Sequence, residues 1–270
     1  MNILKNKQLM IFSILGLSVI LVAIFAPWIA TKDPYSAVMS HSLIPPGKEY
    51  ILGTDRLGRD VFSRIIYGIR PSIIMTFSLI TVVFIIGTTL GIVAGYFGGV
   101  VDDIIMRLAD MMISFPGLVL AIAIAGILGP NMVNSVLAVS LVSWPKYTRL
   151  SRSLILKIKK SMYIEAAIIS GGTPRIILQK HLIPNMIPTV IVTATTDIGT
   201  MMLKLASLSF LGFGAQAPTP EWGLMLNEGR KYMTKAPWLI IYPGISIIIV
   251  IVIFNMLGDS VRDLLNPKKK

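Results

Sequence analysis

Six long apolar runs constrain what this chain can fold into more than any other feature of its sequence. The runs cover residues 9–29, 72–97, 104–128, 132–147, 187–213 and 238–257. A helix needs about 20 apolar residues to cross a bilayer. Because the hydrocarbon core offers no water to backbone polar groups, such runs fold as helices. The sequence therefore predicts an all-α membrane protein, with six transmembrane helices in a single domain over residues 1–270.

The composition indicates a lipid environment rather than a soluble or nucleic-acid-binding protein. Of the 270 residues, 54% are hydrophobic and 14% are charged, whereas soluble domains carry about 25% charged residues. The net charge of +12 comes from basic residues between apolar runs, without a basic stripe interleaved with aromatics. The first run follows Lys5 and Lys7 and is longer than the apolar core of a signal peptide, so we expect a retained anchor. The expected partner is the lipid bilayer, and no nucleic acid.

The basic residues also predict an orientation. Between the fourth and fifth runs lie Lys146, Arg149, Arg152, Lys157, Lys159, Lys160, Arg175 and Lys180. The positive-inside rule places this segment and the basic tail at 268–270 in the cytoplasm. With six spans, both termini of this cell-membrane (inner or plasma membrane) protein are then cytoplasmic, and the loops at 31–71, 129–131 and 214–237 face outward.

Residues 53–70 lie between the first two runs and show helical spacing with a narrow apolar face. We expect an outer amphipathic helix here, with Pro71 and Ser72 at the start of the second span. It could brace the spans or contact a soluble partner. Within the second span, glycines at 87, 91, 95 and 99 line one face and allow another helix to approach closely, in this chain or in a partner.

The segment at 148–185 is long for a connection between neighbouring membrane helices. Ser161 can cap a helix, Gly171 and Gly172 end it, and Pro174 can start a second helix that runs to Pro184. No G-x-x-x-x-G-K-[ST] occurs in the chain. We therefore expect no cofactor in this chain, and any ATP-Mg to be bound by a partner.

The fifth span carries an unusual polar face. Its members are Thr193, Asp197, Thr200, Lys204 and Ser207, with Met201 beside them. Charges inside a membrane are costly, so they normally face a water-filled path or pair with another group. Two alternatives follow: a translocation path, or pairing with other helices, for example with Asp110 or a second subunit. Asp197 and Lys204 are about 10 Å apart along the axis and cannot pair with each other.

Part of the cytoplasmic segment resembles the EAA loop of binding-protein-dependent ABC importer permeases. The matching residues are Glu165, Ala166, Ala167, Gly171, His181, Pro184 and Asn185. The resemblance implies that this short helix docks into a groove on an ATPase subunit, so that ATPase dimerisation moves the spans as rigid bodies. It also implies a non-catalytic permease subunit rather than an enzyme.

Further motifs are similar to the C-type permeases of dipeptide, oligopeptide and nickel importers. The outer-loop positions are Gly53, Asp55, Gly58, Arg59, Asp60, Glu221 and Trp222. This resemblance implies a second homologous permease in a heterodimer, two cytoplasmic ATPases and an extracytoplasmic substrate-binding protein.

The cargo is the least constrained expectation. Asp197 and the neighbouring methionines are more similar to the nickel branch, which favours nickel or a nickel chelate, with a dipeptide or oligopeptide as the alternative. Asp197 would be a transient contact, and no firm metal site is expected. An ATP-independent channel or secondary transporter is a rival class, but neither inverted repeats nor broken midplane helices are visible.

Overall fold

The computed structural model describes residues 7–265, and this part of the chain is helical apart from its loops and one isolated bridge between Thr54 and Asp60. The all-α prediction is confirmed. In order, the helices are α1 (Lys7–Ile24), α2 (Ala26–Ile29), η2 (Met39–His41), α3 (Val61–Phe97), α4 (Gly99–Ser114), α5 (Gly117–Leu128), α6 (Met132–Lys159), α7 (Met162–Ile169), α8 (Pro174–Ile176), the π-helical η3 (Ile177–Leu182), α9 (Ile183–Phe210), α10 (Trp222–Gly229), η4 (Arg230–Tyr232) and α11 (Trp238–Leu265).

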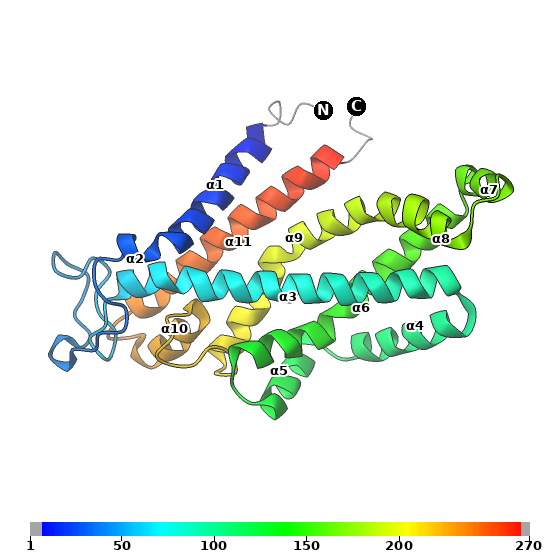
Figure 1. Ribbon diagram of the computed structural model, residues 1–270. Helices are drawn as coiled ribbons and strands as arrows, with labels where there is room; N and C mark the ends of the chain where they lie inside the picture. Colours follow the sequence, from blue (N-terminus) through cyan, green and yellow to red (C-terminus); the bar gives the residue numbers. More distant parts are fainter. Residues whose placement is uncertain (1–6, 266–270) are drawn as a thin grey trace.

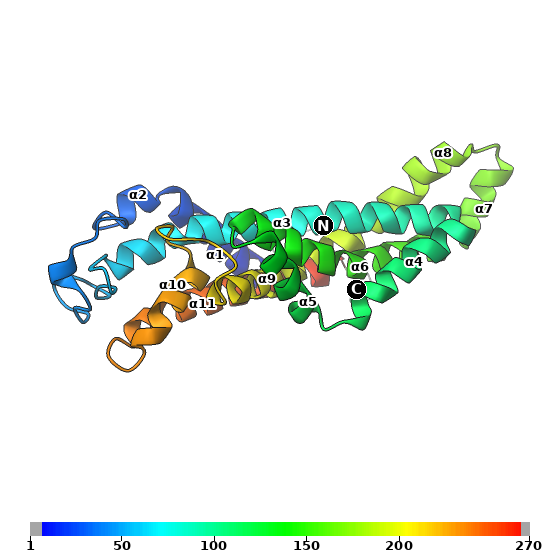
Figure 2. The same cartoon turned by 90° about the horizontal axis from the view of Figure 1, so that it is seen from below.

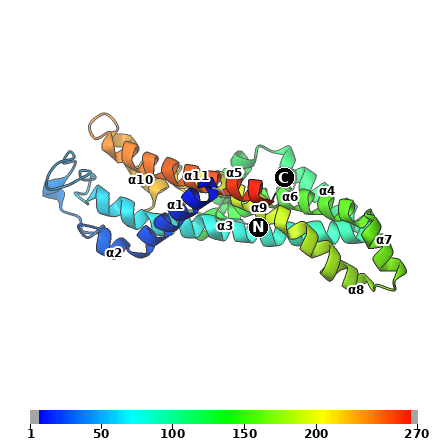
Figure 3. The same ribbon diagram turned by 90° about the horizontal axis from the view of Figure 1, so that it is seen from above.

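The molecule is elongated along α3 (Figures 1 and 2). This helix has 37 residues and a length of about 55 Å, well beyond the roughly 30 Å hydrocarbon core. Helices α6 and α9 pack along it, and α1 lies antiparallel to α11 beside them (Figures 1 and 3). The short helices α7 and α8 lie at one end of α3, and α10 lies with the 31–60 loop at the other (Figure 1).

Four helical stretches of the described residues are long and apolar enough to cross a membrane, and there are five if the bent pair α4–α5 is one span. Helix α6 is not among them, because its second half carries Lys146, Arg149, Arg152, Lys157 and Lys159. A multi-pass helical membrane fold is therefore established, while the count of six remains a prediction.

The expected straight span at 104–128 is broken instead. Helices α4 and α5 meet at 92° across Phe115 and Pro116. Phe115 is extended, with φ −98° and ψ 148°, as is favoured for a residue that precedes proline. Pro116 has no N–H with which to continue the ladder of α4. Pro116 is a signal for this break that the sequence contains, but the length of the apolar run 104–128 favoured one unbroken helix.

The expected separate helix at 53–70 is also wrong, because α3 begins at Val61 and continues through Pro71 without a break. The carboxylate of Asp60 accepts the backbone N–H of Ser63 at 2.9 Å and so caps the helix at this point. Residues 53–60 form turns, in which Gly53 and Gly58 have positive φ. The amphipathic residues 61–70 are therefore the first part of α3.

Around the segment at 148–185, the observed helix boundaries also differ from the expected ones. The fourth predicted span continues as α6 to Lys159, so residues 148–159 are helix rather than loop. The second short helix, which begins at Pro174 as expected, does not end at Pro184 but runs through η3 into α9. Residues 160–173, which include α7, are therefore what separates α6 from the helical stretch that leads into α9.

The glycine face of α3 packs against α6 of the same chain. A Cβ on Gly91 would lie 2.5 Å from Cβ of Ser151, and one on Gly95 would lie 2.9 Å from Cβ of Ile155. Gly87 meets Tyr147 in the same way. The glycine spacing left open whether the approaching helix belongs to this chain or to a partner, and the structure shows that it is α6 of this chain. The contact holds α6 in a fixed register on α3.

Candidate functional site

A partly buried ion pair joins α9 to α6. Lys146 Nζ donates to both carboxylate oxygens of Asp197, at 2.6 and 2.7 Å, and the Tyr147 hydroxyl donates to Asp197 Oδ2 at 3.1 Å. The Asp197 side chain is 9% exposed, whereas that of Lys146 is 56% exposed. Asp197 is thus held by its own chain, with its ammonium partner on the open side.

The other polar residues of α9 lie before and after Asp197 along the helix. Lys204 Nζ donates to Ser143 Oγ of α6 at 3.2 Å. Thr200 is exposed between Asp197 and Lys204, and Thr193 is half-buried with its hydroxyl bonded to the Thr189 carbonyl. Met201 is only 2% exposed and belongs to the core rather than to the open face. The polar face of α9 therefore packs partly against α6 and is partly exposed.

Two further ion pairs tie α6 to α4. Arg152 contacts both oxygens of the Asp102 carboxylate at 2.5 Å, and Arg149 pairs with Asp110. Asp110 is therefore not the partner of the α9 charges that the sequence had suggested as one possibility. Each basic residue at 146, 149 and 152 of α6 has its own carboxylate.

The segment that resembles an EAA loop forms a projecting helical hairpin. Glu165, Ala166 and Ala167 lie on α7, with Glu165 and Ala166 exposed. Gly171 follows at φ 81°, a value at which a side chain is strained. His181 packs near the Tyr163 ring, its carbonyl accepts the Asn185 amide at 2.6 Å, and Pro184 lies in the first turn of α9.

Large apolar side chains are exposed on this hairpin. Met162 is 87% exposed and Ile169 86%, and Ile168 is also open. Only Ile164 of α7 is buried, and it anchors the helix to the rest of the chain. Several neighbouring apolar groups at a projecting tip are typical of a protein-binding surface.

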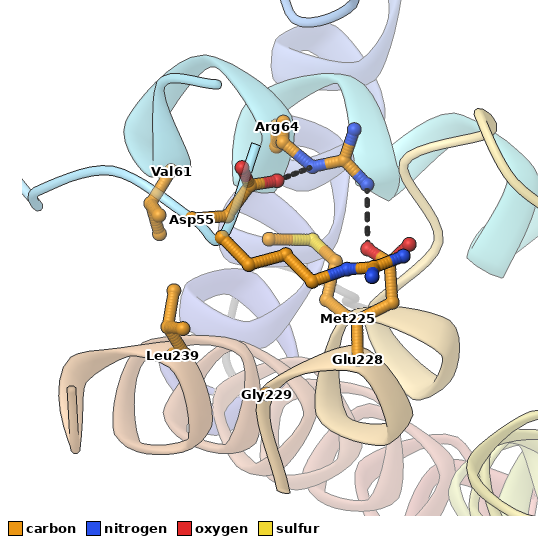
Figure 4. A pocket seen from close by; sticks show the side chains of 8 residues that line it. Asp55, Val61, Arg64, Met225, Glu228, Gly229 and Leu239 are labelled. Atoms are coloured by element: carbon orange, nitrogen blue, oxygen red, sulfur yellow. Dashed lines mark hydrogen bonds and ion pairs between the residues drawn. The ribbon is translucent and has the colours of Figure 1, made fainter. Parts of the chain in front are cut away.

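At the opposite end of α3, a network of two carboxylates and two guanidinium groups is buried. Figure 4 shows three of its four members, Asp55, Arg64 and Glu228, beside the adjoining cavity. Arg59 contacts Asp55 at 2.6 Å and Glu228 at 2.8 Å, and Arg64 contacts the same two acids at 3.6 and 3.4 Å. Both arginine side chains are at most 2% exposed. The adjoining cavity measures only about 10 Å³, so the network is a structural clamp and not a solute site.

The other signature positions surround this clamp. Asp60 caps α3, and Gly53 and Gly58 allow the turns before it. Glu221 caps α10 by accepting the N–H groups of Gly223 and Leu224, and buried Trp222 donates to the Ile65 carbonyl at 3.0 Å. The outer-loop signature is therefore a set of folding contacts between two segments about 160 positions apart in sequence.

Sequence reasoning missed two residues. Lys146 was counted among the loop cations, and Glu228 was not singled out. The only available signal was that Lys146 falls inside the apolar run 132–147, where a charge needs a partner. In the described part of the chain, no group of three or more histidine or acidic residues could hold a metal ion.

An all-helical chain with several helices able to cross a membrane, ion pairs between its helices and a projecting apolar hairpin has the architecture of a membrane transport subunit. Residues 87–270 match the family described as "Binding-protein-dependent transport system inner membrane component". The chain belongs to this family, and it is a permease subunit of an ABC importer. Membership of this family places the chain in the inner membrane and indicates ATPase and permease subunits as partners.

Several known proteins are similar to it. The dipeptide transport system permease protein DppC of Alkalihalophilus pseudofirmus is 44% identical, and the match covers 98% of this chain and 88% of that protein. The nickel transport system permease protein NikC of Escherichia coli K12 is 38% identical, over 92% and 89%. The inward-facing MetNI methionine ABC transporter matches with a TM-score of 0.61 at 18% identity, over 76% of this chain and 98% of that chain, and shares the fold.

Proposed function

We propose that this chain lines half of the translocation path of a short-peptide importer and receives movement from ATPase partners through α7. The observation that carries the coupling assignment is the apolar tip of the hairpin. Met162 and Ile169 are almost fully exposed at the point farthest from the 31–60 loop. In water such a surface is stabilised by a protein partner, and Glu165 adds one acceptor for a basic group.

A direct test disrupts this tip. Met162→Glu combined with Ile169→Glu is expected to leave the chain inserted while abolishing co-purification with the ATPase subunits and ATP-driven uptake. Met233→Glu is the matched control, because Met233 is 58% exposed and lies outside the hairpin, directly after α10 and η4. Normal ATPase association by the double variant would contradict the coupling assignment.

The proposal includes six spans, with α4–α5 as one bent span and α6 as another. The ion pairs of Arg149 and Arg152 with α4, and that of Lys146 with α9, support α6 as a span, because they neutralise its charges within the chain. An even number of spans puts both termini on the side of the basic hairpin, in the cytoplasm. The partners are a second, non-identical permease, two ATPases that bind ATP-Mg, and an outer binding protein.

Short peptides are the cargo that these contacts favour. The expectation of nickel came from Asp197 and its neighbouring methionines, but both carboxylate oxygens of Asp197 are bound by Lys146 and Met201 is 2% exposed. An ammonium group at this place repels a bare divalent cation. The 44% identity to a dipeptide permease points the same way, and nickel, the cargo named for the 38% identical relative, is the second candidate.

Uptake by the reconstituted complex distinguishes the two cargoes. Proteoliposomes that hold both permeases, the ATPases and the binding protein are supplied with labelled dipeptide or labelled nickel. We expect ATP-dependent accumulation of the dipeptide that excess unlabelled dipeptide suppresses and nickel does not. Accumulation of nickel alone would overturn the peptide assignment.

A further inference from the structure

The α6–α9 contact carries more positive than negative charge. Lys146 and Lys204 both face it, and Asp197 is its one acid. Ser143 and Lys146 are three residues apart on α6, and Asp197 and Lys204 are seven apart on α9, so each helix presents its pair on one face. Because the helices are antiparallel here, Lys146 meets Asp197 and Ser143 meets Lys204.

Lys204 differs from the neighbouring cations of α6. Lys146, Arg149 and Arg152 each have a carboxylate partner. Within residues 7–265, no carboxylate lies at ion-pair distance from Lys204, and its ammonium donates a hydrogen bond to the neutral hydroxyl of Ser143. An ammonium group within a membrane helix needs a counter-charge or water.

The surroundings of Lys204 are open on one side. Thr200, one turn before it, is exposed, and so is more than half of the Lys146 side chain. Lys204 itself is half-buried, and its ammonium is held by Ser143 of α6. This face therefore presents one cation that lacks a carboxylate, beside exposed hydroxyl and ammonium groups.

We infer that Lys204 is a specificity-determining residue of the path, which receives the carboxylate of the solute as it crosses. A carboxylate supplies the missing counter-charge and forms a charge-assisted hydrogen bond with Nζ. The inference depends on the proposed peptide function, because a peptide with a free C-terminus carries this group. The Lys146–Asp197 pair next to Lys204 leaves one net positive charge for it.

The test uses the full complex in proteoliposomes and labelled dipeptide. Lys204→Gln removes the charge but keeps a hydrogen-bond donor for Ser143, and Lys204→Met removes both. Both variants should lower the initial rate of uptake by about ten-fold or more while still co-purifying with the ATPase subunits. Lys204→Arg, which keeps the charge, should retain most of the uptake.

Ser143→Ala is the matched control, because it deletes the hydroxyl partner and leaves the cation. It should transport within about two-fold of the unmodified complex. Uptake by Lys204→Gln at the unmodified rate, an equal loss in Ser143→Ala, or failure of both neutral variants to assemble would each overturn the role of Lys204. Absence of dipeptide uptake by the unmodified complex would instead overturn the peptide function on which it depends.

Discussion

At the scale of single residues, the chain pairs Lys146, Arg149 and Arg152 of α6 with carboxylates of α9 and α4. Asp197 is neutralised by Lys146 and hydrogen-bonded by Tyr147. A lone carboxylate at this depth would be costly, whereas a paired one with a hydroxyl donor is satisfied. The open side of Lys146 keeps the pair accessible, which is what a transport path requires.

Breaking this pair should destabilise the protein by a limited amount. Asp197→Ala and Lys146→Met are each expected to lower the free energy of unfolding by about 1–3 kcal/mol, less than for a fully buried pair, because Lys146 can be solvated. In the double variant the losses should be smaller than their sum. Thermal unfolding of the four proteins in detergent measures this, and strictly additive losses would show that the pair contributes nothing.

Glu221 predicts a dependence on pH. Burial raises the pKa of Glu221, and the N–H groups of Gly223 and Leu224 oppose this increase. Its protonation then contributes stability that is fully present below about pH 4.3, the ordinary pKa of glutamate, and is lost as pH rises through the folded-state pKa.

Glu221→Gln removes this titration. The Tm of the variant relative to the unmodified protein should therefore increase as pH is raised from about 4 to about 8. Glu49→Gln is the control, since the Glu49 side chain is 69% exposed, and its relative Tm should stay level. If the Tm of Glu221→Gln relative to the unmodified protein did not change with pH, Glu221 would keep its charge on folding.

At the scale of elements, close packing of α3 on α6 sets the position of everything that α6 carries. The glycines at 87, 91 and 95 let the two backbones approach, and Ser151 and Ile155 fill the space. The same contact orients Lys146 toward α9 and the basic end of α6 toward α7. Movement of α7 can therefore reach the charged face through one continuous helix.

Gly91→Ala tests this contact. The added methyl group meets Cβ of Ser151 and the Thr148 carbonyl at 2.5 Å, so the helices must separate. We expect a loss of about 1–3 kcal/mol in unfolding free energy, measured by denaturation in detergent. Gly244→Ala is the matched helical control, because nothing lies within 4 Å of its Cβ position. Unaltered stability of Gly91→Ala would rule out a tight α3–α6 interface.

At the scale of the whole molecule, the long α3 connects two ends with different surfaces. One end presents the exposed apolar hairpin, and the other is closed by the buried clamp of Asp55, Arg59, Arg64 and Glu228. The clamp joins the start of α3 to α10, and Trp222 and Trp238 add hydrogen bonds to the Ile65 and Thr54 carbonyls. One end is thus rigid, while the other is available to a partner.

Removing one acid of the clamp should be strongly destabilising. Glu228→Gln leaves two buried guanidinium groups with one carboxylate, and we expect a loss of about 3–5 kcal/mol in unfolding free energy. Limited proteolysis of the 31–60 loop should speed up in parallel. Glu49→Gln, at an exposed pair, should cost less than about 1 kcal/mol. Equal effects of the two substitutions would contradict the clamp.

The sequence by itself determined the membrane class and the helical fold, because apolar runs of this length leave the backbone no other way to satisfy its hydrogen bonds. It also placed α7 between Ser161 and Gly171, since helix breaks are local, although the Ser161 hydroxyl donates to the Ile158 carbonyl and does not cap α7. Local rules misjudged Pro71, which α3 tolerates, and the length of one run concealed the bend at Pro116.

Only the tertiary structure decided which charges meet. Lys146 and Asp197 are 51 positions apart, and Arg59 and Glu228 are 169 apart. Such a pairing depends on the register between helices, and that register is set by glycine contacts whose partner a single sequence does not specify. For the same physical reason, the sequence did not show that Lys204 lacks a carboxylate at ion-pair distance among the described residues. That followed only from the positions of the helices around it.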